Sequence, residues 1–394
     1  MPSREPAKRK STKAGAKPRV LHVLASLSLG GIETWLMHML RHHDDFSVEH
    51  EVLLTREQPG DYEEEARRLG IKIHKLPISR NKRAWLRSLG EFLQSNGPFA
   101  AVHSHVYLFS APLLGTAKKA KVPVRIGHCH AARSRGSDHQ TLWHRVRRAI
   151  AIRWLKRVAT RRIGISEAAI EEIAGRGWRG DPTNEVLLYG FDFSRFHGAA
   201  ARAKKLRATL GLTDEAPVVG HVGRFDPVKN HEFLIEAFAA ACRHIPNAQL
   251  VLVGDGPVRE KVAAKAKAVG VDGKVHFAGT TDDVAAYMRM FDLFVLPSFS
   301  EGLGIVVVEA QAAGTRAIVS NVVATEAAVV PAAVQFLPLS AGAKTWGRAI
   351  AQALAPRPKH QDEWLDEVER SRFAINRCIE ELNGIYGSEM ARVR

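Results

Sequence analysis

Two glutamates, Glu301 and Glu309, stand in a segment that otherwise consists mainly of glycine, aliphatic and small residues (PSFSEGLGIVVVEAQAAGT, residues 297–315). The valine run suits a strand, but the residues after it suit a helix, and we interpret the segment as a buried helix closed by Gly314. Glu309 then lies about one turn into that helix. A carboxylate can accept hydrogen bonds from two adjacent sugar hydroxyls but repels a phosphate, so the pair favours a sugar-containing ligand.

Two cations follow a predicted strand in GRFDPVKNH, the segment that begins at Gly223. Arg224 comes at the carboxyl end of the strand, and Lys229 lies five residues later, before a helix. An arginine can bind a diphosphate through two parallel hydrogen bonds, and a lysine adds a point charge. The segment therefore predicts a diphosphate site, with an ordinary solvated loop as the alternative.

A pair of glycines, Gly30-Gly31, stands between a predicted strand and an amphipathic helix. Glycines in this position let backbone N–H groups approach a phosphate at the positive end of the helix. The pattern is not GxGxxG, so it gives little support to a dinucleotide cofactor. A tight turn without a ligand is the alternative.

Short β-branched segments alternate with helix-like segments along the chain, and the alternation starts again after residue 200. Continuous apolar strands separated by helices are typical of parallel sheets covered on both faces. The sequence predicts an α/β protein with two Rossmann-like, doubly wound domains facing a central cleft. We expect a disordered basic tail (1–17), a first domain (18–197), a linker (197–205), a second domain (206–370) and a carboxyl-terminal helix (371–394) that can pack back on the first domain.

Composition sets the broad class of the protein. The 394 residues suffice for two domains, and 45% apolar with 25% charged residues are ordinary values for a folded protein. No apolar run suits a membrane span, and the amino terminus lacks the apolar core of a signal peptide. Three scattered cysteines without a CxxC pair argue against a disulfide framework or a zinc site. We expect a cytosolic protein.

Several motifs together resemble a known family. The E-x7-E pattern of Glu301 and Glu309 is similar to that of the retaining glycosyltransferases of the GT-B fold, family 4, and the resemblance covers nearly the whole chain after the tail. By subtype the chain resembles bacterial exopolysaccharide transferases, because of EAQAAG and VRIGHCHAA. The other matching motifs are Gly30-Gly31, GISEAA (164–169), LYGFDFSRF (188–196), GRFDPVKNH and VGDGP.

The resemblance implies a nucleotide-sugar donor (UDP-, GDP- or ADP-linked) bound by the second domain, and a glycan or lipid-linked acceptor bound by the first. Arg224 and Lys229 would hold the donor diphosphate. Glu309 would bind the ribose hydroxyls, and Glu301 would lie beside the transferred sugar. The product would belong to polysaccharide or lipid-linked glycan biosynthesis.

The resemblance also implies backbone contacts and a histidine. N–H groups of Gly302-Leu303-Gly304 would lie near the sugar hydroxyls or the phosphate, Gly31 would approach the β-phosphate, and residues 277–280 would pass near the base. A histidine after the strand VPVRIGHCH would contact the sugar and support the reaction. We favour His130 for this role, with His128 as the alternative.

The chain departs from the family pattern at Tyr189, where many members carry Asn, and at Leu303, where Phe is common; both leave the sugar identity open. A DxD motif is absent from the sequence, so we expect no metal and no other cofactor. Positive side chains and helix N–H groups would stabilise the leaving diphosphate. No carboxylate is convincingly placed as a covalent nucleophile, so we expect front-face transfer with retention.

A dense basic block over 133–162 accounts for much of the formal net charge of +16. Its segment 140–162 predicts a helix with Trp143 and Trp154 at positions suited to a lipid interface. We expect peripheral association with the inner face of the cytoplasmic membrane; an ordinary cleft-lining helix with a solvated basic face is the alternative. The apolar residues near one face of this helix are Leu142, Val146, Ala149, Ile150 and Val158.

Three other functions compete with glycosyl transfer. Basic charge also suits a nucleic-acid-binding protein, but no recognition module accompanies it, and we expect no nucleic-acid partner. An epimerase or a phosphorylase of the GT-B fold would use the same scaffold, and E-x7-E together with GRFDPVKNH argues against both.

Overall fold

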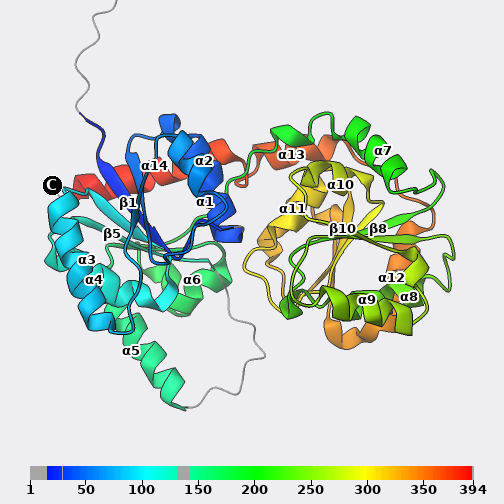
Figure 1. Ribbon diagram of the computed structural model, residues 1–394, viewed down its shortest axis with the longest axis horizontal. Helices are drawn as coiled ribbons and strands as arrows, with labels where there is room; N and C mark the ends of the chain where they lie inside the picture. Colours follow the sequence, from blue (N-terminus) through cyan, green and yellow to red (C-terminus); the bar gives the residue numbers. More distant parts are fainter. Residues whose placement is uncertain (1–15, 29, 131–141, 393–394) are drawn as a thin grey trace, which may run out of the picture.

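The computed structural model describes residues 16–28, 30–130 and 142–392. The basic tail predicted over 1–17 lies almost entirely outside the described residues, as do Arg133 and Arg135 of the basic block. Two α/β domains lie side by side, each with one parallel sheet between layers of helices (Figure 1). The predicted pair of doubly wound domains is confirmed.

The first sheet has seven parallel strands in the order β3-β2-β1-β4-β5-β6-β7. Its central strands are buried along almost their whole length, which explains their continuous apolar sequences. The strands are β1 (Arg19–Leu24), β2 (Glu49–Leu54), β3 (Lys72–Lys75), β4 (Ala101–Ser104), β5 (Val124–Cys129), β6 (Arg161–Gly164) and β7 (Asn184–Val186), and the helices are α1 (Gly31–Arg41), α2 (Glu63–Arg68), α3 (Lys82–Asn96), α4 (Ser110–Lys119), α5 (Leu142–Val158) and α6 (Glu167–Ala174).

The second sheet has six parallel strands in the order β10-β9-β8-β11-β12-β13. In both sheets the strand order reverses beside the first strand, β1 or β8, which is where ligands of such sheets bind. The strands are β8 (Val218–Val222), β9 (Gln249–Val253), β10 (Val275–Gly279), β11 (Leu293–Leu296), β12 (Arg316–Ser320) and β13 (Val334–Leu337), and the helices are α7 (Ala199–Thr209), α8 (His231–Ala241), α9 (Arg259–Ala268), α10 (Val284–Met290), α11 (Ile305–Ala312), α12 (Gly342–Leu354) and α13 (Glu363–Arg370).

The core of the second domain depends on a close approach at Gly220 in β8. A Cβ atom at this position would lie 2.0 Å from the ring of Phe291, which is fully buried. The aromatic ring thus packs directly on the strand backbone, and this contact fixes helix α10 against the sheet. Burial of such a ring stabilises the fold by about 1.5–3 kcal/mol.

The two connections between the domains differ from a simple linker. Most of the segment expected as a linker, 197–205, belongs to helix α7, which packs against α10 of the second domain. At the other end, α13 leads into α14 (Ile375–Arg392), which crosses back to the first domain (Figure 1). There the Tyr386 hydroxyl lies 2.8 Å from His103 Nδ1, and Arg161 forms an ion pair of 3.0 Å with Glu389.

Candidate functional site

A cavity of about 710 Å³ lies between the two domains at the carboxyl ends of both sheets. Both domains contribute, so the cavity exists only when they are assembled. It brings together most of the residues that the sequence predicted, namely Gly30, Gly31, His130, Arg224, Lys229, Glu301, Gly302, Leu303 and Gly304. Glu309, His128 and residues 277–279 are not among its lining residues, whereas Thr280 is.

The predicted diphosphate cations differ in their surroundings. Lys229 Nζ lies 2.7 Å from Glu301 Oε1, so the lysine is paired with the carboxylate that was predicted to face the sugar. The Ser298 hydroxyl donates to the same carboxylate oxygen at 2.5 Å. Arg224 is exposed and forms no ion pair with any described residue. Lys229 and Glu301 thus neutralise each other, whereas no acid among the described residues compensates the charge of Arg224.

The segment after Glu301 is helical, as predicted. Gly304 adopts a left-handed conformation (φ 76°) immediately before α11, and Gly314 (φ 72°) closes the helix. The first N–H groups of a helix have no partner within it, and Ile305 and Val306 line the cavity. Helix α11 therefore directs its positive end toward the cavity, which favours an anion there.

Glu309 lies one turn into α11, on the same face as Ile305 but behind the cavity lining. Its side chain is half-buried, and its carboxylate has no hydrogen-bond or ion-pair partner among the described residues. Burial raises the pKa of this carboxyl group to about 7. Its predicted contact with a ribose stays a prediction, because Glu309 is not among the residues that line the cavity.

The domains touch directly at Gly302. A Cβ atom here would lie 2.7 Å from the backbone oxygen of His130 and 3.1 Å from the side chain of Ile165, both in the first domain. Nearby, the Ser166 hydroxyl donates to the Gly302 oxygen at 3.4 Å. Glycine is thus required at position 302, because the segment before α11 approaches the backbone of His130 closely.

Of the two candidate histidines, His130 lines the cavity and His128 lies buried beside it, with ring centroids 4.0 Å apart. His130 Nδ1 lies 2.7 Å from the Tyr189 hydroxyl. Tyr189, noted from the sequence only as a departure from the family pattern, therefore belongs to the cavity wall. Sequence reasoning also missed His105, which lies 2.8 Å from the other ring nitrogen of His130. The HxH spacing in VHSHVY and IGHCHA could have indicated it, because alternate residues of a strand share one face.

Comparison with known proteins decides the family. A model for "Glycosyl transferases group 1" matches residues 203–367, and one for a "Glycosyl transferase 4-like domain" matches residues 30–190. EpsF of Bacillus subtilis (strain 168) is 33% identical over 361 residues, which cover 88% of this chain and 90% of EpsF. The chain belongs to the group 1 glycosyltransferases. The family favours glycosyl transfer over the epimerase, phosphorylase and nucleic-acid-binding alternatives.

Solved structures show the same two-domain arrangement as this glycosyltransferase. HepE of Anabaena in complex with UDP superposes with a TM-score of 0.77 at 18% identity, covering 94% of this chain and 100% of HepE. HepE has also been solved with UDP-glucose. WaaG, a glycosyltransferase involved in lipopolysaccharide biosynthesis, gives a TM-score of 0.68 at 17% identity, covering 93% of this chain and 99% of WaaG. The fold is therefore GT-B.

Proposed function

We propose that this glycosyltransferase moves a sugar from a nucleotide-diphosphate sugar to an acceptor with retention of the anomeric configuration. The observation that carries the proposal is the interdomain cavity. There Arg224, which has no ion-pair partner among the described residues, and the amino end of α11 meet a hydrogen-bonded Glu301. The Arg224 guanidinium and the helix amino end suit a diphosphate, and the Glu301 carboxylate suits the hydroxyls of a sugar. The complexes of HepE with UDP and UDP-glucose agree with such a donor.

In this proposal the donor diphosphate lies between Arg224 and α11, with the sugar toward Glu301 and His130. Lys229 leaves part of its contact with Glu301 to meet the phosphate oxygens. The bond from the anomeric carbon to the phosphate oxygen breaks while the acceptor oxygen bonds the same face of that carbon. The acceptor proton passes to the departing phosphate oxygen, and the cations stabilise the charge that develops there.

Glu301 is a sugar-binding group rather than a covalent nucleophile in this mechanism. Lys229 and the Ser298 hydroxyl both occupy Glu301 Oε1. Hydrogen bonds and a paired charge stabilise the carboxylate and reduce its nucleophilicity. Arg224, Lys229 and the N–H groups at the amino end of α11 can supply positive charge to a diphosphate. We therefore propose that these groups stabilise the leaving diphosphate without a metal.

A screen of UDP-, GDP- and ADP-sugars by thermal shift tests the donor, and nuclear magnetic resonance of the glycoside product tests the stereochemistry. We expect one donor series to stabilise the wild type and to stabilise Arg224→Ala much less. Arg243→Ala, on the surface outside the cavity, is the matched control. A product of inverted configuration would refute the mechanism, and the absence of stabilisation by every nucleotide sugar would refute the donor site.

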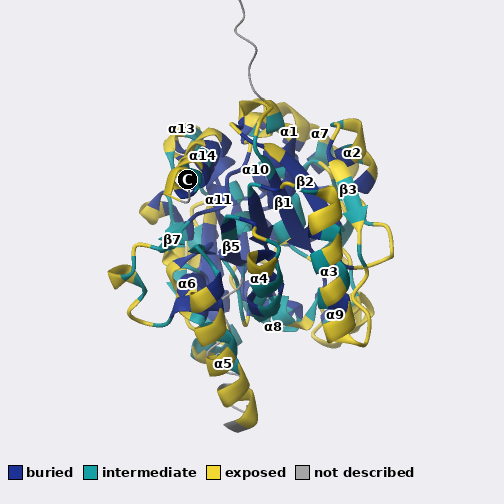
Figure 2. Ribbon diagram, turned by 90° about the vertical axis from the view of Figure 1, so that its left-hand side faces the viewer, coloured by how far each residue is buried: buried dark blue, intermediate teal, exposed yellow. Residues whose placement is uncertain are grey.

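The acceptor side of the proposal concerns the basic helix α5, which projects from the first domain and is exposed toward its far end (Figure 2). Trp143 (65% exposed), Val146 (42%), Ile150 (60%) and Trp154 (43%) recur at helical spacing and form one stripe. This differs from the apolar face expected from the sequence, because Val158 is buried. Arg147, Arg153, Lys156 and Arg157 are exposed along the same helix.

Exposed tryptophans beside cations suit an anionic membrane surface. We therefore assign α5 as the surface that brings the enzyme to lipid-linked or glycan acceptors at the cytoplasmic membrane. Among the described residues no helix has the length and apolarity to cross a bilayer. We expect cosedimentation with phosphatidylglycerol vesicles that weakens in high salt and in Trp143→Ala/Trp154→Ala, but not in the control Trp178→Ala. Binding that is equal to neutral phosphatidylcholine vesicles would contradict the assignment.

A further inference from the structure

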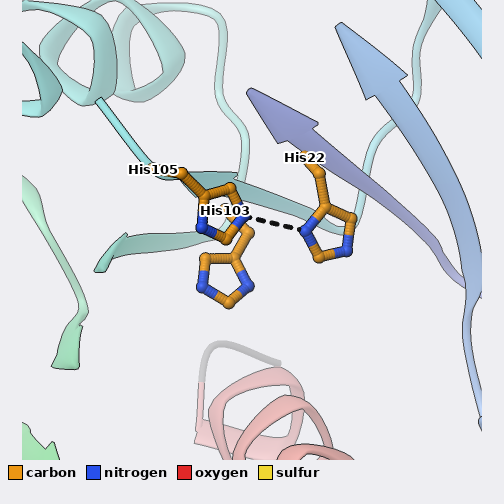
Figure 3. A group of neighbouring side chains, drawn as sticks. All are labelled: His22, His103 and His105. Carbon is orange, nitrogen blue, oxygen red and sulfur yellow. Dashed lines mark hydrogen bonds between the residues drawn. The ribbon is translucent and has the colours of Figure 1, made fainter. Parts of the chain in front are cut away.

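Six buried or half-buried histidines gather on one face of the first sheet. Alternate residues of a strand share a face, and His22 in β1 is the register partner of His103 in β4. Helices α1 and α14 cover this face, through Trp35 and Tyr386. Figure 3 shows three of the rings, His22, His103 and His105, turned toward one another. The full set is His22, His50, His103, His105, His128 and His130.

Four of these rings form one continuous chain of hydrogen bonds that ends at Tyr189. Nδ1 of His50 lies 2.9 Å from Nε2 of His22, and Nδ1 of His22 lies 3.1 Å from Nε2 of His105. Nδ1 of His105 then lies 2.8 Å from Nε2 of His130, whose Nδ1 lies 2.7 Å from the Tyr189 hydroxyl. Every link joins Nδ1 of one ring to the next group in the chain.

All members of this chain are neutral near pH 7. Burial lowers the pKa of His22 to about 3 and lowers the pKa values of His50, His105 and His130 well below their usual value. Burial also raises the pKa of the Tyr189 hydroxyl well above its usual value. A neutral imidazole has one N–H and one lone pair. The chain can therefore point in only two directions, with every ring protonated on Nδ1 or every ring protonated on Nε2.

The two ends of the chain decide between these directions. At one end, His50 Nε2 is buried without a hydrogen-bond partner among the described residues, whereas at the other end Tyr189 lines the cavity. Protonation on Nε2 throughout would leave an N–H of His50 buried and unpaired. Protonation on Nδ1 leaves only a lone pair there, and buried N–H groups without partners are the rarer case. It also leaves the Tyr189 hydrogen free at the cavity, where water or a ligand can accept it.

We propose that the chain from His50 to His130 fixes His130 as a donor to the Tyr189 oxygen, so that the Tyr189 hydroxyl donates a hydrogen bond into the cavity to an oxygen of the nucleotide sugar. Trp35 stacks on the Tyr189 ring at 5.1 Å and 17° and holds it in place. His50, His22 and His105 are positioning residues, and Tyr189 is a substrate-binding residue. The identity of the ligand in this inference rests on the proposed function, whereas the direction of the histidine hydrogen bonds does not.

A metal ion is the competing occupant of this cluster. Nitrogen atoms of His22, His103 and His105 lie within 4.8 Å of one another, as do those of His105, His128 and His130. In the first group, however, both nitrogens of every ring already have a partner. A metal would take lone pairs that the chain uses, so the hydrogen bonds favour the chain.

Nuclear magnetic resonance of the full chain with 15N-labelled histidine tests the direction without a ligand. We expect His22, His50, His105 and His130 all to carry hydrogen on Nδ1, opposite to the Nε2 form that free histidine prefers. Single His→Phe variants assign the signals. Protonation of His130 on Nε2 would overturn the proposal, and so would one equivalent of zinc or another transition metal in the protein as purified.

Removal of one hydroxyl tests the ligand contact. We expect Tyr189→Phe to lower the affinity for the nucleotide sugar and kcat/KM by about three- to tenfold, the effect of one neutral hydrogen bond. Tyr386→Phe is the control, because its hydroxyl bonds His103 inside the first domain; we expect unchanged donor affinity. Circular dichroism and Tm verify that both variants fold. Unchanged affinity in Tyr189→Phe would overturn the contact, whereas a wild type that binds no nucleotide sugar would refute the proposed function and leave the imidazole result standing.

Discussion

We expect Glu309 to make folding stability fall as the pH rises, and Glu309→Gln to remove this loss. Burial raises the pKa of the carboxyl group from 4.5 to about 7, so between these values the folded protein holds a proton that the unfolded chain has released. The stability from this group is fully present below pH 4.5 and is lost as the pH rises through 7. At 1.36 kcal/mol per pH unit, the interval corresponds to at most about 3 kcal/mol, and the remaining exposure of the side chain reduces it.

Urea unfolding of the wild type and Glu309→Gln at pH 5, 6, 7 and 8 measures this effect. We expect the variant to gain stability relative to the wild type from pH 5 to pH 8, by up to about 3 kcal/mol. The exposed Glu363→Gln, on α13, controls for the loss of one negative charge. A difference between wild type and Glu309→Gln that stays constant over this pH range would refute the reasoning.

Donor binding should change in the opposite direction from stability. An ionised Glu309 can accept hydrogen bonds from two ribose hydroxyls, whereas an amide offers one acceptor oxygen. We therefore expect Glu309→Gln to be the more stable protein at pH 8 and the weaker binder of the donor. The affinity of the wild type should fall as the pH drops below 7, because binding must then displace the proton. Calorimetry in buffers of different ionisation enthalpy would detect the proton released on binding.

Three further substitutions test the geometry of the cavity and its support. Gly302→Ala should lower transfer activity at least tenfold with little change in Tm, because its Cβ would lie 2.7 Å from the oxygen of His130; Gly384→Ala, with open space around it, is the control in activity and small-angle scattering measurements. Arg224→Ala should weaken binding of the nucleoside diphosphate by about ten- to a hundredfold, the effect of a charge-assisted hydrogen bond, as measured by calorimetry. Gly220→Ala should destabilise the second domain by about 1–3 kcal/mol in urea unfolding, because a Cβ there would overlap a buried ring.

The sequence predicts the fold well because the signals that determine it are local. Continuous β-branched runs that alternate with helix-like segments predicted the two parallel sheets, and the Glu301 segment predicted helix α11 ending at Gly314. The segment 197–205, expected as a linker, is mostly helix. Its alanines, lysines and single arginine are good helix formers and could have indicated this. Its polar composition suggested an exposed connection, and only the contact with α10 shows that it packs as part of the second domain.

The sequence indicates which residues line the cavity, but not which of their side chains bond one another. Arg224 and Lys229 share the loop after β8, Glu301 follows β11 and His130 follows β5. Their shared location follows from the position of strand ends in doubly wound sheets. That Lys229 bonds Glu301 depends on rotamers and on a contact across 72 residues of chain. The histidine chain likewise joins strands whose neighbours are set by topology, so spacing within one strand could suggest only single links.

The ion pair of Lys229 with Glu301 predicts which ligands the proposed donor site prefers. The side chains of Lys229 and Glu301 are largely buried, so their pair must be exchanged for new partners rather than simply hydrated when a ligand enters. A nucleotide sugar offers both partners at once, phosphate oxygens for Lys229 and hydroxyls for Glu301, whereas inorganic phosphate offers only the first. An anion without a sugar would leave Glu301 buried beside new negative charge. We therefore expect the site to bind nucleotide sugars more tightly than the free nucleoside diphosphate, and Glu301→Gln to reverse this order in the same calorimetric titrations.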